Sequence, residues 1–190
     1  MTARTALTYQ DYAALPDGKR YEIHDGELSV MAAPTALHQI VLGKLFKALD
    51  DHVTARRLGL VVLSPLDVIL SDRPSETTIL QPDLVYLDNV RLEALRLRGV
   101  EGPPTLAVEI FSPSTAVMDR TRKRELYARY GVPYLWFVDP NTRRLAAHVL
   151  ESGEYRLVAR VSGSEPVDLP PFTDLGLDPS SLWPQFPIRP

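Results

Sequence analysis

The stretch Leu106-Ala107-Val108-Glu109-Ile110-Phe111 places a single acid in the middle of an apolar run. Upstream, the segment Asp83-Leu84-Val85-Tyr86-Leu87 is apolar after its first residue, an acid that follows Pro82. Short apolar runs rich in branched and aromatic residues are typical of buried β-strands. The helical pattern that follows the second run carries Lys123. This order predicts two adjacent buried strands that each contribute a carboxylate, and a lysine on the next helix.

The segments around these two strands predict further helices and strands. Thr8 is a typical N-cap for a short helix that ends before Pro16. The Asp25-Gly26 pair predicts the turn of a β-hairpin over residues 20–32. An apolar stripe predicts a long helix from residue 35 to about 58, with Gly59 as its stop. Other helical segments are expected at 91–98, 114–130 and 180–182, a polar loop at 71–78, and strands at 60–70 with a break at Pro65, 134–138, 145–150 and 155–161.

This order of elements predicts an α/β fold. We expect a central mixed β-sheet flanked by helices, with an N-terminal hairpin and a C-terminal β-meander. No internal repeat or long linker divides the sequence. We therefore expect one domain over residues 1–190, with a core at about 20–150 and a proline-rich tail at about 166–190.

Composition excludes several classes of protein. Apolar residues make up 45% of the 190 residues and charged residues 24%, which argues against a disordered or fibrous chain. The absence of cysteine excludes disulfides, thiolate zinc sites and thiol nucleophiles. No apolar run approaches the ~20 residues that span a bilayer, and the N-terminus lacks the apolar core of a secretory signal. We expect a cytoplasmic protein with no membrane partner.

Net charge alone does not decide whether the protein binds nucleic acid. The formal net charge is −3, whereas nucleic-acid binders usually present a basic face. Basic residues nevertheless gather between Arg120 and Arg129, and the only acids in or next to this segment are Asp119 and Glu125. Such a cluster is either a solvated helix face or part of a basic groove, and an enzyme needs only the groove.

Two buried carboxylates are suited to binding a hard divalent cation. Mg²⁺ prefers oxygen ligands, commonly one or two carboxylates completed by water and substrate phosphate oxygens. Asp83 and Glu109 meet that need. An acid among leucine, valine, isoleucine and phenylalanine calls for a charged partner, and a metal or a lysine would supply it. A metal-assisted phosphodiester hydrolysis is the chemistry that this pattern favours.

Several motifs occur in an order that is similar to that of a known family. They are Tyr21-Glu22, Asp25-Gly26-Glu27, Pro34, His38, Pro82-Asp83, Val108-Glu109-Ile110-Phe111-Ser112-Pro113-Ser114-Thr115, Asp119, Lys123, Tyr127, Gly131-Val132-Pro133, Trp136 and Asp139-Pro140. Residues 20 to about 149 thus resemble a large bacterial family of putative restriction endonucleases within the PD-(D/E)xK nuclease superfamily. The resemblance implies a restriction-endonuclease-like core and an endonuclease site that uses Mg²⁺, or Mn²⁺ in its place. Members of the family look commonly dimeric, so we expect a homodimer. We expect the substrate to be nucleic acid, with DNA favoured over RNA.

The resemblance also implies roles for particular residues. Asp83 and Glu109 match the two acids of the motif and would be metal ligands, joined by the backbone carbonyl of Ile110. Phe111 stands where the parent motif has its lysine. Lys123 would replace that lysine from the next helix and orient the attacking water or stabilise charge in the transition state.

Four further residues are candidates for supporting roles. The first core helix carries no acid between Thr35 and Lys47, and His38 occupies its first turn. Glu22 either faces the site from the hairpin or is a solvated strand residue. Asp119 and Lys123 stand four residues apart, so Asp119 either supports the site or merely forms an ion pair with Lys123 along the helix. Tyr127 has the same spacing from Lys123 and should share its face.

Three functions are compatible with this pattern. The first is the metal-dependent nuclease, and the second is a nucleic-acid-binding module that kept the fold without turnover. The third is a dimeric interaction protein in which the buried charges only fix packing. A catalytic serine at 112 or 114 is rejected, because no neighbouring base would activate it, and Ser114 is better explained as a helix N-cap.

Overall fold

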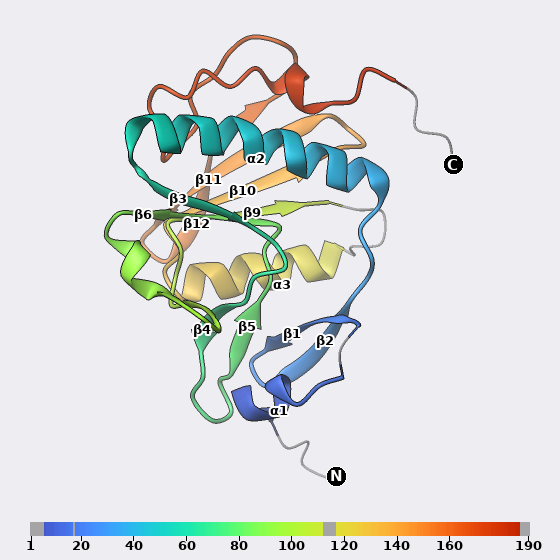
Figure 1. Cartoon of the computed structure of the whole chain (residues 1–190), viewed down its shortest axis with the longest axis vertical. Helices are drawn as coiled ribbons and strands as arrows, with labels where there is room; N and C mark the ends of the chain where they lie inside the picture. The colour runs from blue at the N-terminus through green and yellow to red at the C-terminus, as the bar shows by residue number, and fades with distance from the viewer. Residues whose placement is uncertain (1–5, 17, 112–116, 187–190) are drawn as a thin grey trace.

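The computed structural model describes residues 6–16, 18–111 and 117–186, with side chains from residue 120 onward in the last range. Figure 1 shows two sheets stacked along the long axis, with one long helix over the upper sheet. The helices are α1 (Tyr9–Ala13), α2 (Ala36–Arg56) and α3 (Val117–Arg129), with 3₁₀ turns η1 (Arg91–Ala94) and η2 (Pro179–Leu182). The strands are β1 (Arg20–His24), β2 (Glu27–Met31), β3 (Gly59–Leu63), β4 (Val68–Ser71), β5 (Thr78–Leu80), β6 (Leu84–Asp88), β7 (Leu95–Arg96), β8 (Gly99–Glu101), β9 (Leu106–Ile110), β10 (Tyr134–Asp139), β11 (Arg144–Glu151) and β12 (Glu154–Val161).

The central sheet has the strand order β12-β11-β10-β9-β6-β3. Strands β9 and β10 run parallel, and the other neighbouring pairs are antiparallel, so the sheet is mixed as the sequence predicts. Strands β6 and β9 pair with Leu84 opposite Val108. This register places the next residues along the two strands, Asp83 and Glu109, at the same end of the pair.

Helices cover both faces of this sheet (Figure 1). Helix α2 packs Val41, Leu45 and Leu49 against one face, in a core that also contains Trp136 and tail residues such as Phe172. Helix α3 packs Leu126 and Tyr127 against the opposite face. The two-faced burial explains the nearly continuous apolar composition of β6 and β9. None of the helices within the described residues is long and apolar enough to cross a membrane.

A second sheet, in the order β2-β1-β5-β4-β8-β7, lies beside the first and carries the predicted hairpin. His24 pairs with Glu27, so Asp25 and Gly26 form the two-residue turn. Both have positive φ, 51° and 80°, which a type I′ turn requires. Strands β1 and β5 are antiparallel neighbours, and this pairing brings the hairpin under the central sheet.

Three local expectations were wrong. The segment 91–98 is helical only at η1, and Leu95–Arg96 pairs with β8 as a short strand. The loop predicted at 71–78 ends in β5, whose three residues Thr78, Ile79 and Leu80 are all buried. The residue that ends α2 in the left-handed conformation is Arg57, at φ 56°, rather than Gly59.

Gly59 has a different role, because it lets β3 approach β6. A Cβ built on Gly59 would lie 2.0 Å from the carbonyl oxygen of Leu87, and its φ is 143°. The helix start predicted at residue 114 and the Ser114 cap lie outside the described residues. Within the described residues, α3 begins at Val117.

Candidate active site

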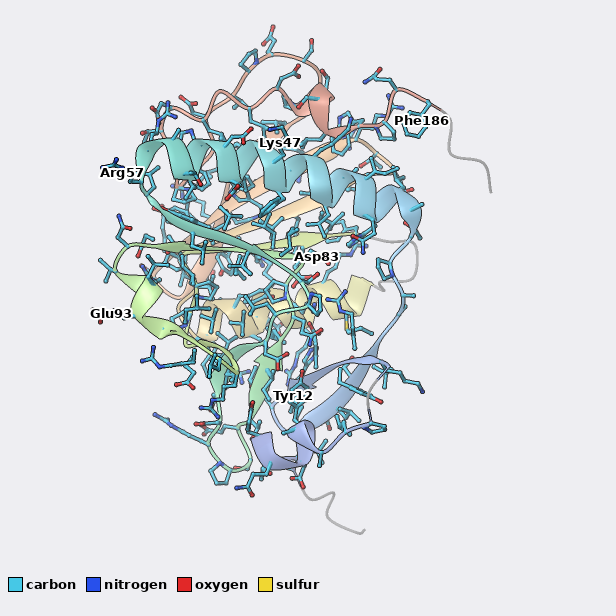
Figure 2. All side chains as sticks on the ribbon, viewed as in Figure 1. Tyr12, Lys47, Arg57, Asp83, Glu93 and Phe186 are labelled. Carbon is cyan, nitrogen blue, oxygen red and sulfur yellow. The ribbon has the colours of Figure 1, made fainter. Side chains whose placement is uncertain are left out.

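Asp83 directly precedes β6 and is buried against the first turn of α2. Its Oδ2 accepts a hydrogen bond of 2.7 Å from the backbone N–H of Ile110, which ties it to β9. The Nε2 atom of His38 lies 3.1 Å from the same oxygen. Thr35 caps α2 and accepts from the His38 N–H at 3.2 Å, which fixes the turn that carries the histidine. Figure 2 shows Asp83 near the middle of the molecule, between α2 and α3 in this view.

Lys123 joins two carboxylates from different sheets. Its Nζ lies 2.8 Å from Oε1 of Glu22 on β1 and 3.1 Å from both carboxylate oxygens of Glu109 on β9. The Lys123 side chain is 3% exposed and that of Glu22 is 0% exposed. A charge buried to this degree is stable only with such partners. The ammonium is thus the centre around which α3, the hairpin and the central sheet meet.

The remaining polar atoms of the two glutamates are also bonded. The Tyr127 hydroxyl donates to Oε1 of Glu109 at 2.6 Å. The backbone N–H of Gln81 donates to Oε1 of Glu22 at 2.8 Å, and His24 Nε2 lies 3.0 Å from its Oε2. These contacts hold both carboxylates in single positions before any ligand arrives.

Charge is unevenly distributed over this cluster, and the two glutamates respond in opposite directions. Burial and the nearby charges of Asp83 and Glu22 raise the pKa of the Glu109 carboxyl to about 8, because they outweigh the effects of Lys123 and Tyr127. Burial also opposes ionisation of Glu22, but the charge of Lys123 and the bond to His24 outweigh it and lower the pKa of Glu22 to about 2. Lys123 contacts two of the acids, Glu22 and Glu109, and the third, Asp83, is close enough to Glu109 to help raise its pKa.

The acidic pair fits a divalent cation by its donor chemistry. Within the described residues, no three histidine, aspartate or glutamate side chains are placed to hold a metal ion together. Mg²⁺ needs fewer, since one or two carboxylates and water complete many of its sites. The pKa of Glu109 is raised mainly by burial, with smaller contributions from the charges of Asp83 and Glu22. A cation beside Asp83 and Glu109 would favour the ionised form of both acids.

The structure brings together nearly all the residues that the sequence analysis selected. Asp83, Glu109, Ile110, Lys123, His38, Glu22 and Tyr127 all contribute to one connected cluster. The side chain of Asp119 lies outside the described residues, so its pairing with Lys123 stays a prediction. Their metal-binding and catalytic roles also stay predictions.

His24 and Gln81 belong to the cluster and were not selected as site residues. His24 could have been found from its alternation with Glu22 on one strand, since residues two apart share a face. The contact of Gln81 is made by its backbone N–H and leaves no signal in its side chain.

The central mixed sheet, its flanking helices and the acid-lysine cluster define a restriction-endonuclease-like protein. The chain belongs to the Uma2 family, whose model, described as "Putative restriction endonuclease", matches residues 9–180. A solved structure is similar in fold: a putative nuclease belonging to DUF820 from Anabaena variabilis ATCC 29413, with 17% sequence identity and a TM-score of 0.75. The alignment covers 93% of this chain and 97% of that one. None of the curated proteins matches this chain.

Proposed function

We propose that this protein is a divalent-metal-dependent endonuclease that hydrolyses phosphodiester bonds of nucleic acid, with DNA as the first substrate to test. The observation that supports it best is the buried lysine held between Glu22 and Glu109, with Asp83 and Glu109 at the same end of two adjacent buried strands. Two carboxylates placed in this way suit a divalent cation.

The proposal assigns a separate task to each group. Asp83, Glu109 and the carbonyl of Ile110 would hold Mg²⁺ or Mn²⁺, which supplies Lewis-acid activation of a phosphate and of a bound water. The N–H of Ile110 fixes the Asp83 carboxylate, and the Tyr127 hydroxyl fixes that of Glu109. The ammonium of Lys123 would donate hydrogen bonds to the attacking water or to developing charge on the phosphate.

Glu22 would serve this arrangement as a positioning residue. It binds the lysine ammonium at 2.8 Å and accepts a hydrogen bond from the Gln81 N–H, so it holds Lys123 in place. Lys123 therefore does not depend on Glu109 alone, and it keeps a carboxylate partner if Glu109 turns toward a metal.

A nicking assay on supercoiled plasmid and on single-stranded DNA tests the proposal. Wild-type protein should cleave with Mg²⁺ or Mn²⁺ and stop when EDTA removes the metal. Asp83→Asn and Glu109→Gln should each lower the rate by about 100-fold or more, in the range that loss of a positioned catalytic group produces. Asp51→Asn is the matched control, because Asp51 is an exposed acid of α2 that pairs with Lys47. Equal activity of Asp83→Asn and Asp51→Asn would refute the assigned site.

A second function is supported by one observation. Both carboxylate oxygens of Glu109 already contact Lys123, and one also accepts from Tyr127. A cluster saturated in this way also suits a nucleic-acid-binding module without turnover. Binding of DNA with no cleavage under either metal would favour that function.

The homodimer and the cytoplasmic location also stay predictions from the sequence. Light scattering on the purified protein tests the first, and fractionation of cells tests the second.

A further inference from the structure

Arg120 is placed differently from the other arginines of α3. Arg122 and Arg129 both bind Asp25 at the hairpin turn, at 2.5 Å and 2.8 Å. Arg124 donates to the backbone carbonyl of Tyr155 at 2.6 Å. The guanidinium of Arg120 instead lies over the ring of Phe111, with its carbon 4.2 Å from the ring centroid. Three arginines are therefore used to fasten the helix, and the fourth is held by an aromatic face.

Stacking on a ring fixes a guanidinium but leaves its donors available. The N–H groups of arginine lie in the guanidinium plane, so contact through the face does not use them. The Nε of Arg120 is buried and has no hydrogen-bond partner among the described residues. A buried donor without a partner is costly, which indicates that a ligand completes this site.

The position of Arg120 connects it to the acid-lysine cluster. Arg120, Lys123 and Tyr127 follow one another at spacings of three and four residues, so they lie along one face of α3. Along this line the side chains change from fully buried Tyr127, through 3% exposed Lys123, to partly exposed Arg120. Arg120 is therefore at the solvent end of the cluster, where an incoming ligand arrives first.

Phe111 connects the same arginine to β9. It follows Ile110 directly, and its N–H donates to the Val138 carbonyl at 2.8 Å, which continues the strand pairing. Residues two apart on a strand share a face, so Phe111 and Glu109 point to the same side. The ring also packs on Phe137 at 5.2 Å. Phe111, which occupies the lysine position of the parent motif, thus holds the Arg120 cation on its ring.

We propose that Arg120 binds a phosphate of the nucleic-acid substrate next to the scissile bond. This inference rests on the proposed nuclease function, and it assigns a residue that attracts the substrate phosphate to the site. The site carries the acids Asp83, Glu109 and Glu22, and carboxylates repel a phosphate that approaches them. An arginine at the solvent end offsets that repulsion, and its planar fork matches two phosphate oxygens.

Fluorescence anisotropy of labelled single-stranded and duplex DNA tests the proposal in EDTA, where metal-dependent cleavage does not interfere. Arg120→Ala should raise Kd about tenfold or more, as expected for loss of a charge-assisted contact. It should also lower the slope of log K against log salt by about one. Arg124→Ala is the matched control: it removes the same charge from the same helix and should change Kd much less. Arg120→Lys should keep the salt slope but bind more weakly than wild type.

The outcomes separate this proposal from the nuclease itself. Equal affinities of the Arg120→Ala and Arg124→Ala variants would overturn the phosphate site, even if wild-type protein cleaves DNA. A loss confined to Arg120→Ala, with unchanged thermal unfolding, would support the site even if no variant cleaves. Wild-type protein that binds neither probe at low salt would overturn the phosphate site, whereas the nuclease is decided by the nicking assay with metal.

Discussion

Replacing Lys123 by methionine should destabilise the folded protein strongly, because it leaves two buried carboxylates without their cation. Methionine, like lysine, has an unbranched side chain and fills much of the same space, so the substitution mainly removes the charge. The ammonium contacts Glu22 at 2.8 Å and Glu109 at 3.1 Å, and the lysine side chain is 3% exposed. Solvent cannot take the place of the lost partner at that depth.

The magnitude follows from the burial of the ion pair. Removing one partner of a buried ion pair costs about 3–5 kcal/mol. The direction agrees with the pKa of Glu22: burial raises it, but Lys123 is the largest contributor that lowers it, to about 2. Domains are commonly stable by about 5–15 kcal/mol, so the variant should fold but only marginally.

The pH dependence gives the prediction a sign. Without the lysine, burial raises the folded-state pKa of both acids above the unfolded value, so their contribution to stability is present at low pH and is lost as pH rises. Glu22 in the wild type behaves oppositely, since its lowered pKa gives a contribution that is lost only as pH falls. The difference in free energy between the two proteins should therefore be larger at about pH 8 than at about pH 5.

Urea unfolding of wild type, Lys123→Met and Lys47→Met at both pH values is the measurement. Lys47 is 76% exposed and pairs with Asp51 on the same helix, so its replacement should change the free energy of unfolding very little at either pH. If Lys123→Met is as stable as Lys47→Met, the carboxylates do not depend on this cation and the reasoning fails.

Two further predictions concern Glu109 and the glycines. The pKa of Glu109 is raised from 4.5 to about 8, so its contribution to the free energy of unfolding falls as pH rises through that window. Glu109→Gln should therefore lose less stability than wild type between these pH values. Urea midpoints measured across the window test this. Gly43 is exposed on α2 and nothing lies near its Cβ position, so Gly43→Ala should stabilise the protein by up to about 1 kcal/mol. The Cβ of Gly59→Ala would meet Leu87, so this variant should be destabilised by about 2 kcal/mol or more. Thermal unfolding of the two variants tests this, and equal midpoints would contradict it.

The central sheet could be predicted because each strand carries its own signal. The runs at 84–88 and 106–110 are apolar on both faces, and the hairpin has a turn sequence that few other conformations accept. The second sheet had weaker signals. Its strands β5, β7 and β8 have three, two and three residues, too short for any periodicity to appear.

The candidate site could be selected from sequence because buried acids are rare and costly. Glu109 and Asp83 were recognisable from their apolar neighbours, and Lys123 from the resemblance to a family. The sequence left Glu22 undecided between the site and solvent. Its burial depends on the pairing of β1 with β5, which brings the hairpin beneath α3, and that pairing is a long-range contact without a local pattern.

The lysine of this site is carried by a helix, and this makes its placement depend on helical phase. A residue inserted into α3 before Lys123 would turn the ammonium by about 100° around the helix axis and advance it by about 1.5 Å. It would then point away from Glu109 and Glu22, although every residue of the cluster would still be present in the sequence. Members of this family should therefore tolerate insertions poorly between Arg120 and Tyr127, where the spacing of the residues defines the site.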